Sequence, residues 1–135
     1  MHEWALAQAI IDAAVDVATR EDARRIVEIN IVLGELQTID KEILRVALEN
    51  IKKDTIARDA AINFESEKMR FRCNLCGHEW GLDKLDDILN ENEIESIHFI
   101  PELVHAFVRC PNCGGSDYEI VAGRGVYIKS IRVEK

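Results

Sequence analysis

The sequence predicts an α+β domain that is interrupted by a small cysteine-rich module, and three patterns indicate it. Apolar residues recur at intervals of three and four in two segments, as on one face of a helix. Apolar and polar residues alternate in other segments, as in strands that are buried on one side. Two C-x-x-C pairs, at 73–76 and 110–113, contain every cysteine of the 135-residue chain.

The cysteine pairs predict a metal site with a structural role. A C-x-x-C turn places two thiolates close together, and two such turns complete a tetrahedron around zinc. A glycine follows each pair, Gly77 and Gly114, and suits the tight turn. A four-thiolate site has no open coordination position, so its zinc is expected to hold structure and not to perform chemistry. The predicted zinc ligands are Cys73, Cys76, Cys110 and Cys113.

Other uses of paired cysteines fit this sequence less well. A disulfide framework is typical of small secreted proteins, but the chain starts with no apolar signal segment. Thioredoxin-like redox chemistry needs one C-x-x-C on a βαβ unit. Iron is an alternative ion for the same four sulfurs, and zinc is favoured because nothing else suggests electron transfer. Reduced cysteines and the absence of a targeting segment predict a cytoplasmic protein.

The first half of the chain predicts helix, strand, helix and strand in that order. Residues 25–33 alternate between apolar and polar side chains and predict a half-buried strand. Asp40 is a good N-cap for a second helix, and residues 61–67 predict a short strand. The apolar face of the first helix, which is expected to begin near residue 6, comprises Leu6, Ile10, Ala13, Ala14 and Val17.

Strand-like segments lie on both sides of the cysteine region. Residues 118–133 predict a long strand interrupted at 123–125, where glycines suggest a bulge or bend. The chain is therefore expected to leave the α+β domain, build a zinc ribbon and return for its last strand. The predicted domains are residues 1–68 with 117–135, and an inserted ribbon at 69–116. Between the cysteine pairs, an acidic run from Asp83 to Glu95 is interpreted as a solvated or interaction surface, with a short helix near 82–89.

Composition limits the function classes. Apolar residues make up 47% of the chain, enough for a core, and no apolar run is long enough to span a membrane. The net charge of −8 argues against general nucleic-acid binding, which relies on Lys and Arg. Three arginines lie near the cysteines in sequence and could contact phosphates. A zinc-ribbon adaptor or nucleic-acid-binding module is therefore kept as an alternative function. No phosphate-binding loop or nucleophile motif occurs, and a closed zinc cannot activate water, so an enzyme is not expected.

The N-terminal residues carry a second candidate metal site. The α-amine of Met1, the amide nitrogen of His2 and the His2 imidazole are placed to chelate one ion in adjoining small rings. Nitrogen donors in a square plane suit Ni(II) or Cu(II), and one equatorial position stays available for Glu3 or a distant ligand. An incidental terminal histidine is the plainer interpretation of this short pattern. His98, between two apolar residues, is equally consistent with a half-buried histidine.

Four features taken together resemble the HypA family of nickel metallochaperones, which act in the maturation of [NiFe] hydrogenase. They are Met1–Glu3, Leu33–Leu36, the two cysteine pairs and Gly123–Gly125. The resemblance extends over essentially the whole chain. The long spacing between the cysteine pairs and the Ile97–Pro101 segment are similar to the archaeal branch of the family.

The resemblance implies a nickel domain with two helices on a three-stranded sheet, and a zinc ribbon inserted before the last strand. It implies Ni(II) as cargo, bound by the Met1 amine and by the amide and imidazole of His2, with His98 as the fourth ligand. Glu3 matches a position that supports or contributes to the site. The implied partners are a nucleotide-hydrolysing protein of the HypB type and the large-subunit precursor of [NiFe] hydrogenase.

Overall fold

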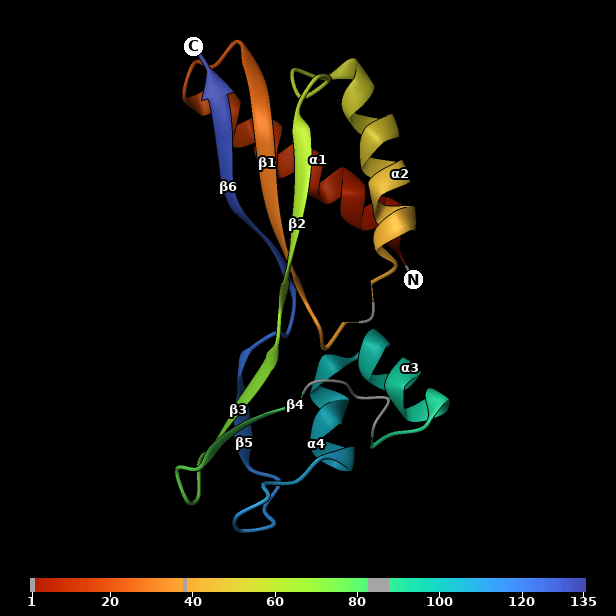
Figure 1. Ribbon diagram of the computed structural model, residues 1–135, viewed down its shortest axis with the longest axis vertical. Coiled ribbons are helices and arrows are strands. Elements are labelled where there is room, and N and C mark those ends of the chain that lie inside the picture. The colour runs from red at the N-terminus through yellow and green to blue at the C-terminus, as the bar shows by residue number, and fades with distance from the viewer. Residues whose placement is uncertain (1, 38, 83–87) are drawn as a thin grey trace. The chain divides into compact units, whose positions relative to one another are not determined.

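The structure, a computed structural model, describes residues 2–37, 39–82 and 88–135. It confirms the predicted α+β class, with two small sheets and with helices on the first of them (Figure 1). The chain divides into two compact units. The first comprises Met1–Val32, Ile39–Glu65 and Val126–Lys135, and the second comprises Leu33–Thr38 and Ser66–Gly125. No helix in the described ranges is long and apolar enough to span a bilayer.

The first unit is a three-stranded sheet with two helices against one face (Figure 1). Its strands lie in the order β2-β1-β6, with β2 at Ala61–Glu67, β1 at Arg25–Gly34 and β6 at Val126–Glu134. Helix α1 (Glu3–Arg20) packs against α2 (Lys41–Ile51), which the short 3₁₀ turn η1 (Lys52–Asp54) follows. The predicted strand at residues 61–67 is confirmed, and β1 extends the predicted strand by one residue.

Sequence predicted the start of α2 better than that of α1. Asp40 caps α2 as expected, because its carboxylate accepts hydrogen bonds from the backbone amides of Glu42 and Ile43, each at 3.1 Å. Helix α1 begins at Glu3, three residues before the predicted start, so the N-terminal motif runs directly into a helix.

The second unit is built on an antiparallel sheet in the order β4-β3-β5. Its strands are β3 (Met69–Cys73), β4 (Glu79–Leu82) and β5 (Tyr118–Ala122). A helical segment that sequence did not predict lies between the cysteine pairs: α3 (Glu91–Phe99), the 3₁₀ turn η3 (Pro101–Leu103) and α4 (Val104–Phe107). The helix expected near 82–89 falls largely on residues 83–87, which lie outside the described part of the chain.

An aromatic cluster forms the core of this second unit. Phe71, Trp80 and Tyr118 come from the three strands, and their ring centroids lie 5.1–5.4 Å apart. The Tyr118 hydroxyl donates toward the carbonyl oxygen of Val108 at 2.8 Å, so the chain just before the second cysteine pair is tied to the sheet. Burial raises the pKa of Tyr118 to about 12, and the hydroxyl therefore remains a donor at physiological pH.

The segment Leu33–Thr38 belongs to the second unit although its first two residues are the last two of β1. The Gly34 amide donates to Gly125 O at 2.8 Å, and the Leu36 amide donates to Gly123 O at 2.9 Å. A Cβ on Gly34 would lie 2.4 Å from Gly123 O, so no larger residue fits there without a backbone shift. Leu36 is fully buried in the same core cluster as Cys73. The predicted interruption of the last strand at 123–125 is confirmed, and it separates β5 and β6 into different sheets.

Candidate metal centres

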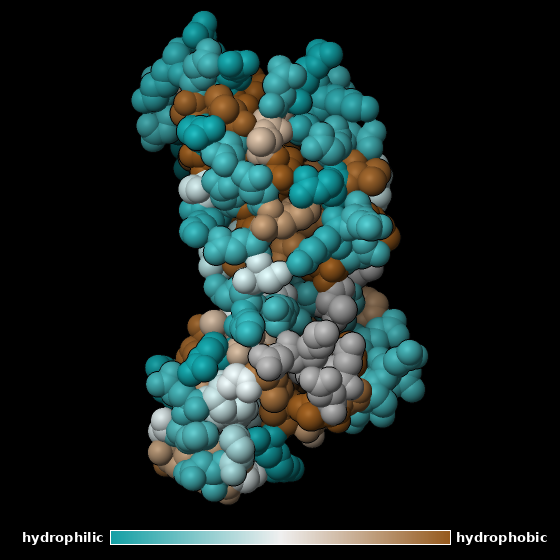
Figure 2. Space-filling model, viewed as in Figure 1, coloured by the Kyte–Doolittle hydropathy of each residue, from teal (hydrophilic) through white to brown (hydrophobic). Residues whose placement is uncertain are grey.

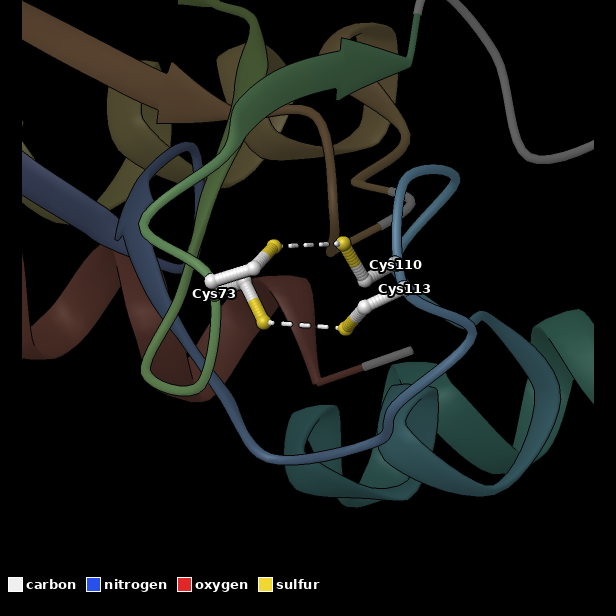
Figure 3. A group of neighbouring side chains, drawn as sticks. Cys73, Cys110 and Cys113 are labelled. Carbon is white, nitrogen blue, oxygen red and sulfur yellow. Dashed lines mark hydrogen bonds between the residues drawn. The ribbon is translucent and has the colours of Figure 1, made fainter.

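The four cysteines converge as their spacing predicted. Their sulfur atoms all lie within 4.8 Å of one another. Cys73 Sγ is 3.6 Å from Cys113 Sγ, and Cys76 Sγ is 3.7 Å from Cys110 Sγ. Figure 3 shows the two turns facing each other, with the sulfurs directed into the space between them. Zinc–sulfur bonds of about 2.3 Å in a tetrahedron place sulfurs about 3.8 Å apart, so this donor set fits zinc.

The two cysteine turns have the same backbone geometry. Gly77 and Gly114 have φ values of 76° and 75°, in the left-handed region that favours glycine. The Gly77 amide donates to Cys73 O at 3.0 Å, and the Gly114 amide donates to Cys110 O at 2.8 Å. Each turn therefore holds its two sulfurs on one side, and each is anchored to the sheet core through a buried first cysteine.

The thiols of the cluster differ in acidity. The Asn112 side chain donates a hydrogen bond to Cys76, and together with the His78 backbone it lowers the pKa of Cys76 to about 6. For Cys113, the Gly115 amide favours the thiolate, but the neighbouring thiols outweigh it and raise the pKa to about 11. Four close thiols cannot all ionise without a cation, so a divalent metal is the natural way to stabilise this cluster.

His2 lies at the start of α1 in the first unit. It is exposed and occupies the N-cap position, where its carbonyl oxygen accepts from the Leu6 amide at 2.9 Å. The first four amides of a helix have no intrahelical acceptor, so α1 does not need the His2 amide proton. A metal that displaces this proton would therefore leave the helix intact. Met1 lies outside the described residues.

Glu3 is buried at the first position of α1, with 2% of its surface exposed. Its Oε2 accepts a hydrogen bond from the Asp40 backbone amide at 3.2 Å. Burial opposes ionisation of Glu3, but hydrogen bonds to the carboxylate, including that from Asp40, keep its pKa below the ordinary value. Glu3 therefore ties the start of α1 to the N-cap of α2. Sequence analysis identified Asp40 only as a cap, because nothing in sequence spacing signals this contact.

His98 lies near the end of α3 in the second unit and is 9% exposed. Its ring packs edge-on against Phe99, with the centroids 5.9 Å apart. The structure thus agrees with a largely buried histidine, and a part for His98 in binding nickel stays a prediction. The His78 ring stacks on Trp80 with the centroids 6.1 Å apart, and the His105 ring is tilted against Tyr118 at 4.3 Å, so both histidines pack on the aromatic core of the second unit.

Comparisons with known proteins cover the whole chain. The family model described as "Hydrogenase/urease nickel incorporation, metallochaperone, hypA" matches residues 1–133. The hydrogenase maturation factor HypA of Pyrococcus abyssi is 53% identical over 135 residues, covering 100% of this chain and 97% of that protein. Its counterpart in Pyrococcus furiosus is 50% identical over the same length, with the same coverage.

A solved structure shares the fold. The solution structure of the Ni metallochaperone HypA from Helicobacter pylori aligns with a TM-score of 0.67 at 20% identity, covering 99% of this chain and 98% of that one. The fold, the four-cysteine cluster and the family match over residues 1–133 all agree with the resemblance. The chain therefore belongs to the HypA family of metallochaperones for nickel incorporation.

Proposed function

We propose that this protein binds Ni(II) at its N-terminus and delivers it for the maturation of [NiFe] hydrogenase, while zinc at the four cysteines maintains the second unit. The observation that carries the proposal is the family match from residue 1, which includes the Met1–Glu3 motif. The exposed His2 at the start of α1 supports it. The net charge of −8 disfavours a nucleic-acid module, and Arg72, one of the arginines near the cysteines, is engaged in an ion pair with Glu119.

Three nitrogens are proposed to hold the ion: the Met1 amine, the His2 amide and the His2 imidazole. The positive end of the α1 dipole opposes a cation at this position, and the buried Glu3 carboxylate in the first turn offsets it. Glu3 is thus proposed to support the site. His98 is proposed to supply the fourth donor.

A terminal chelate suits a carrier. Protonation of the α-amine or a competing ligand can dismantle it without unfolding the helix that follows. The proposed recipients are a HypB-type nucleotide-hydrolysing partner and the hydrogenase large-subunit precursor. Because Cu(II) outcompetes Ni(II) at nitrogen donors, selection in the cell must rest on metal supply and on these partners.

Calorimetric titration of the zinc-loaded chain with Ni(II) tests the proposal. His2→Ala removes the imidazole donor and is expected to weaken nickel binding at least about tenfold, in line with the loss of one chelating ligand. His78→Ala removes another exposed histidine and is the matched control. If His2→Ala binds nickel as tightly as the native chain, nickel does not bind at the terminus.

A further inference from the structure

An apolar groove of about 540 Å³ runs along α1 and β6 within the first unit. Leu6, Ala13 and Val17 line it from the helix, and Val126, Ile128 and Ile131 line it from the strand. Val17 is 46% exposed, and Tyr127, which also borders the groove, is 48% exposed.

The groove exists because the apolar stripe of α1 is wider than the core requires. The core takes Ala7, Ile11 and Ala18, which are fully buried. Ala13 and Val17, which belong to the predicted apolar face, are exposed and form part of one wall of the groove. The predicted apolar face of α1 therefore lines the groove as one surface, and only part of it enters the core.

Other large apolar residues of this unit are exposed as well, including Ile43 and Val46 on α2, but they do not line this groove. Polar side chains also pair across the strands of this sheet: Asn63 donates to Asn30 Oδ1 at 2.9 Å, and Lys129 pairs with Glu65 at 3.1 Å. Hydrophilic side chains dominate the face of this unit that Figure 2 shows. A groove with apolar walls on such a unit indicates a surface that is covered in use.

The shape of the groove favours a helix as its occupant. Ala9 and Ala13, four residues apart on α1, are small enough to let a second helix approach closely. The stretch from Leu6 to Val17 is about 17 Å long at 1.5 Å per residue, or about three helical turns. An added strand fits less well, because exposed Lys129 and Ser130 interrupt the alternation of β6, and lysine on a sheet edge discourages pairing.

The negative charge beside the groove favours a basic helix as the occupant. Asp12 and Asp16 lie on the exposed flank of α1, where their partners Gln8 and Arg20 are exposed as well. Such exposed pairs are weak and exchange readily for a partner's cation. The chain carries a net charge of −8, so a second copy would be repelled and a basic partner attracted.

We propose that this groove binds an amphipathic helix of a partner protein, with aliphatic residues on the face that enters the groove and Lys or Arg on its flanks. The proposal concerns a protein partner and does not depend on where nickel binds.

The probe is a synthetic peptide of about 18 residues, five helical turns, with Leu and Ile at i, i+3, i+4 and i+7 and Lys on both flanks. Fluorescence anisotropy measures its binding to the full-length, zinc-loaded chain. Val17→Glu places a charge in the groove and is expected to weaken binding at least about tenfold. Val46→Glu is the matched control, since Val46 is 54% exposed on α2 and does not line the groove. Both variants are checked for native circular dichroism.

Each outcome decides the proposal. Saturable binding that Val17→Glu weakens, that Val46→Glu leaves unchanged and that falls with added salt supports it. A peptide with Glu flanks should bind more weakly than the Lys peptide. The proposal is overturned by equal binding of the Glu peptide, by absence of saturable binding, or by equal loss in both variants. Preference for an alternating Val/Lys strand peptide also overturns it. So does concentration-dependent dimerisation of the chain that Val17→Glu abolishes, because a second copy is then the occupant.

Discussion

The cysteine cluster and the proposed nickel site at the N-terminus present their candidate ligands in opposite ways. The four sulfurs are held within 4.8 Å of one another by two matching turns that are anchored in an aromatic core. His2, by contrast, is exposed at the N-cap of α1, and its side chain makes no capping hydrogen bond to the helix. A closed set of four ligands on a folded core suits an ion that stays. A terminal set suits an ion that must leave.

The sharpest way to test this contrast is to remove one sulfur. Cys73→Ser is expected to abolish zinc retention and to unfold the ribbon core, because binding of a structural zinc supplies folding free energy of about 10–16 kcal/mol in small zinc domains. Metal analysis should show loss of zinc, and the near-UV circular dichroism of the Phe71, Trp80 and Tyr118 cluster should collapse.

The first unit provides the internal control for that experiment. The far-UV signal of α1 and α2 should persist in Cys73→Ser, because neither helix contributes a cysteine. Loss of zinc with an intact near-UV spectrum would show that the zinc at the cysteines is not what holds the second unit together.

A smaller effect is expected at the backbone contact between Gly34 and the 123–125 turn. Gly34→Ala places a Cβ 2.4 Å from Gly123 O and 2.5 Å from Gly125 O, and backbone atoms cannot rotate away. The substitution should lower the free energy of unfolding of the second unit by about 1–3 kcal/mol. Denaturant unfolding followed by near-UV circular dichroism measures it.

Gly125→Ala is the matched control, because nothing lies within 4 Å of its added Cβ. It should change the free energy of unfolding by no more than about 0.5 kcal/mol. Equal losses in the two variants would mean that the close approach at Gly34 is not responsible.

The smallest expected effect is a difference in pH response between the two sites. Protons compete with zinc for thiolates, and Cys76 has a pKa of about 6 in the metal-free cluster. Below about pH 6 the Cys76 thiol is protonated, and zinc must displace that proton in order to bind. Zinc affinity should therefore fall more steeply with decreasing pH below 6 than above it. Asn112→Ala removes a hydrogen bond that favours the thiolate, raises the pKa of Cys76 and should move this steepening to higher pH.

Asn74→Ala is the control for the pH experiment, because the Asn74 side chain donates to Asp117 Oδ1 and not to a sulfur. Competition titrations with a zinc indicator at a series of pH values follow the change. Nickel should respond in a different range, because an α-amine titrates near pH 7.7–8.0 and nickel affinity should rise through that interval. Identical pH profiles for the two metals would argue against separate sites.

Local patterns predicted the parts of this molecule that depend on local chemistry. The cysteine turns, the strand at 61–67 and the Asp40 cap follow from residues within a few positions of one another. Helix α3 was not predicted, because its acidic residues were interpreted as part of a solvated run. Asn90 and Glu93 nevertheless form a capping box at its start.

Features that depend on distant contacts were not predictable. The hydrogen bond between Glu3 and the Asp40 amide joins residues 37 positions apart. The exposure of Ala13 and Val17 depends on which strands lie under α1, and helical spacing alone does not reveal that. Leu36 lies in the core of the second unit because the carbonyl oxygens of Gly123 and Gly125 accept hydrogen bonds from the segment that carries it. No local sequence pattern predicts this pairing.

The most direct test of the central claim is nickel calorimetry on zinc-loaded protein, with the native N-terminus and with a short Gly-Ser extension before Met1. The extension keeps every side chain and moves only the α-amine away from His2. Nickel binding should be lost or greatly weakened in the extended chain, while zinc content and circular dichroism stay unchanged. Unchanged nickel affinity in the extended chain would contradict the terminal chelate and with it the proposed mode of nickel delivery.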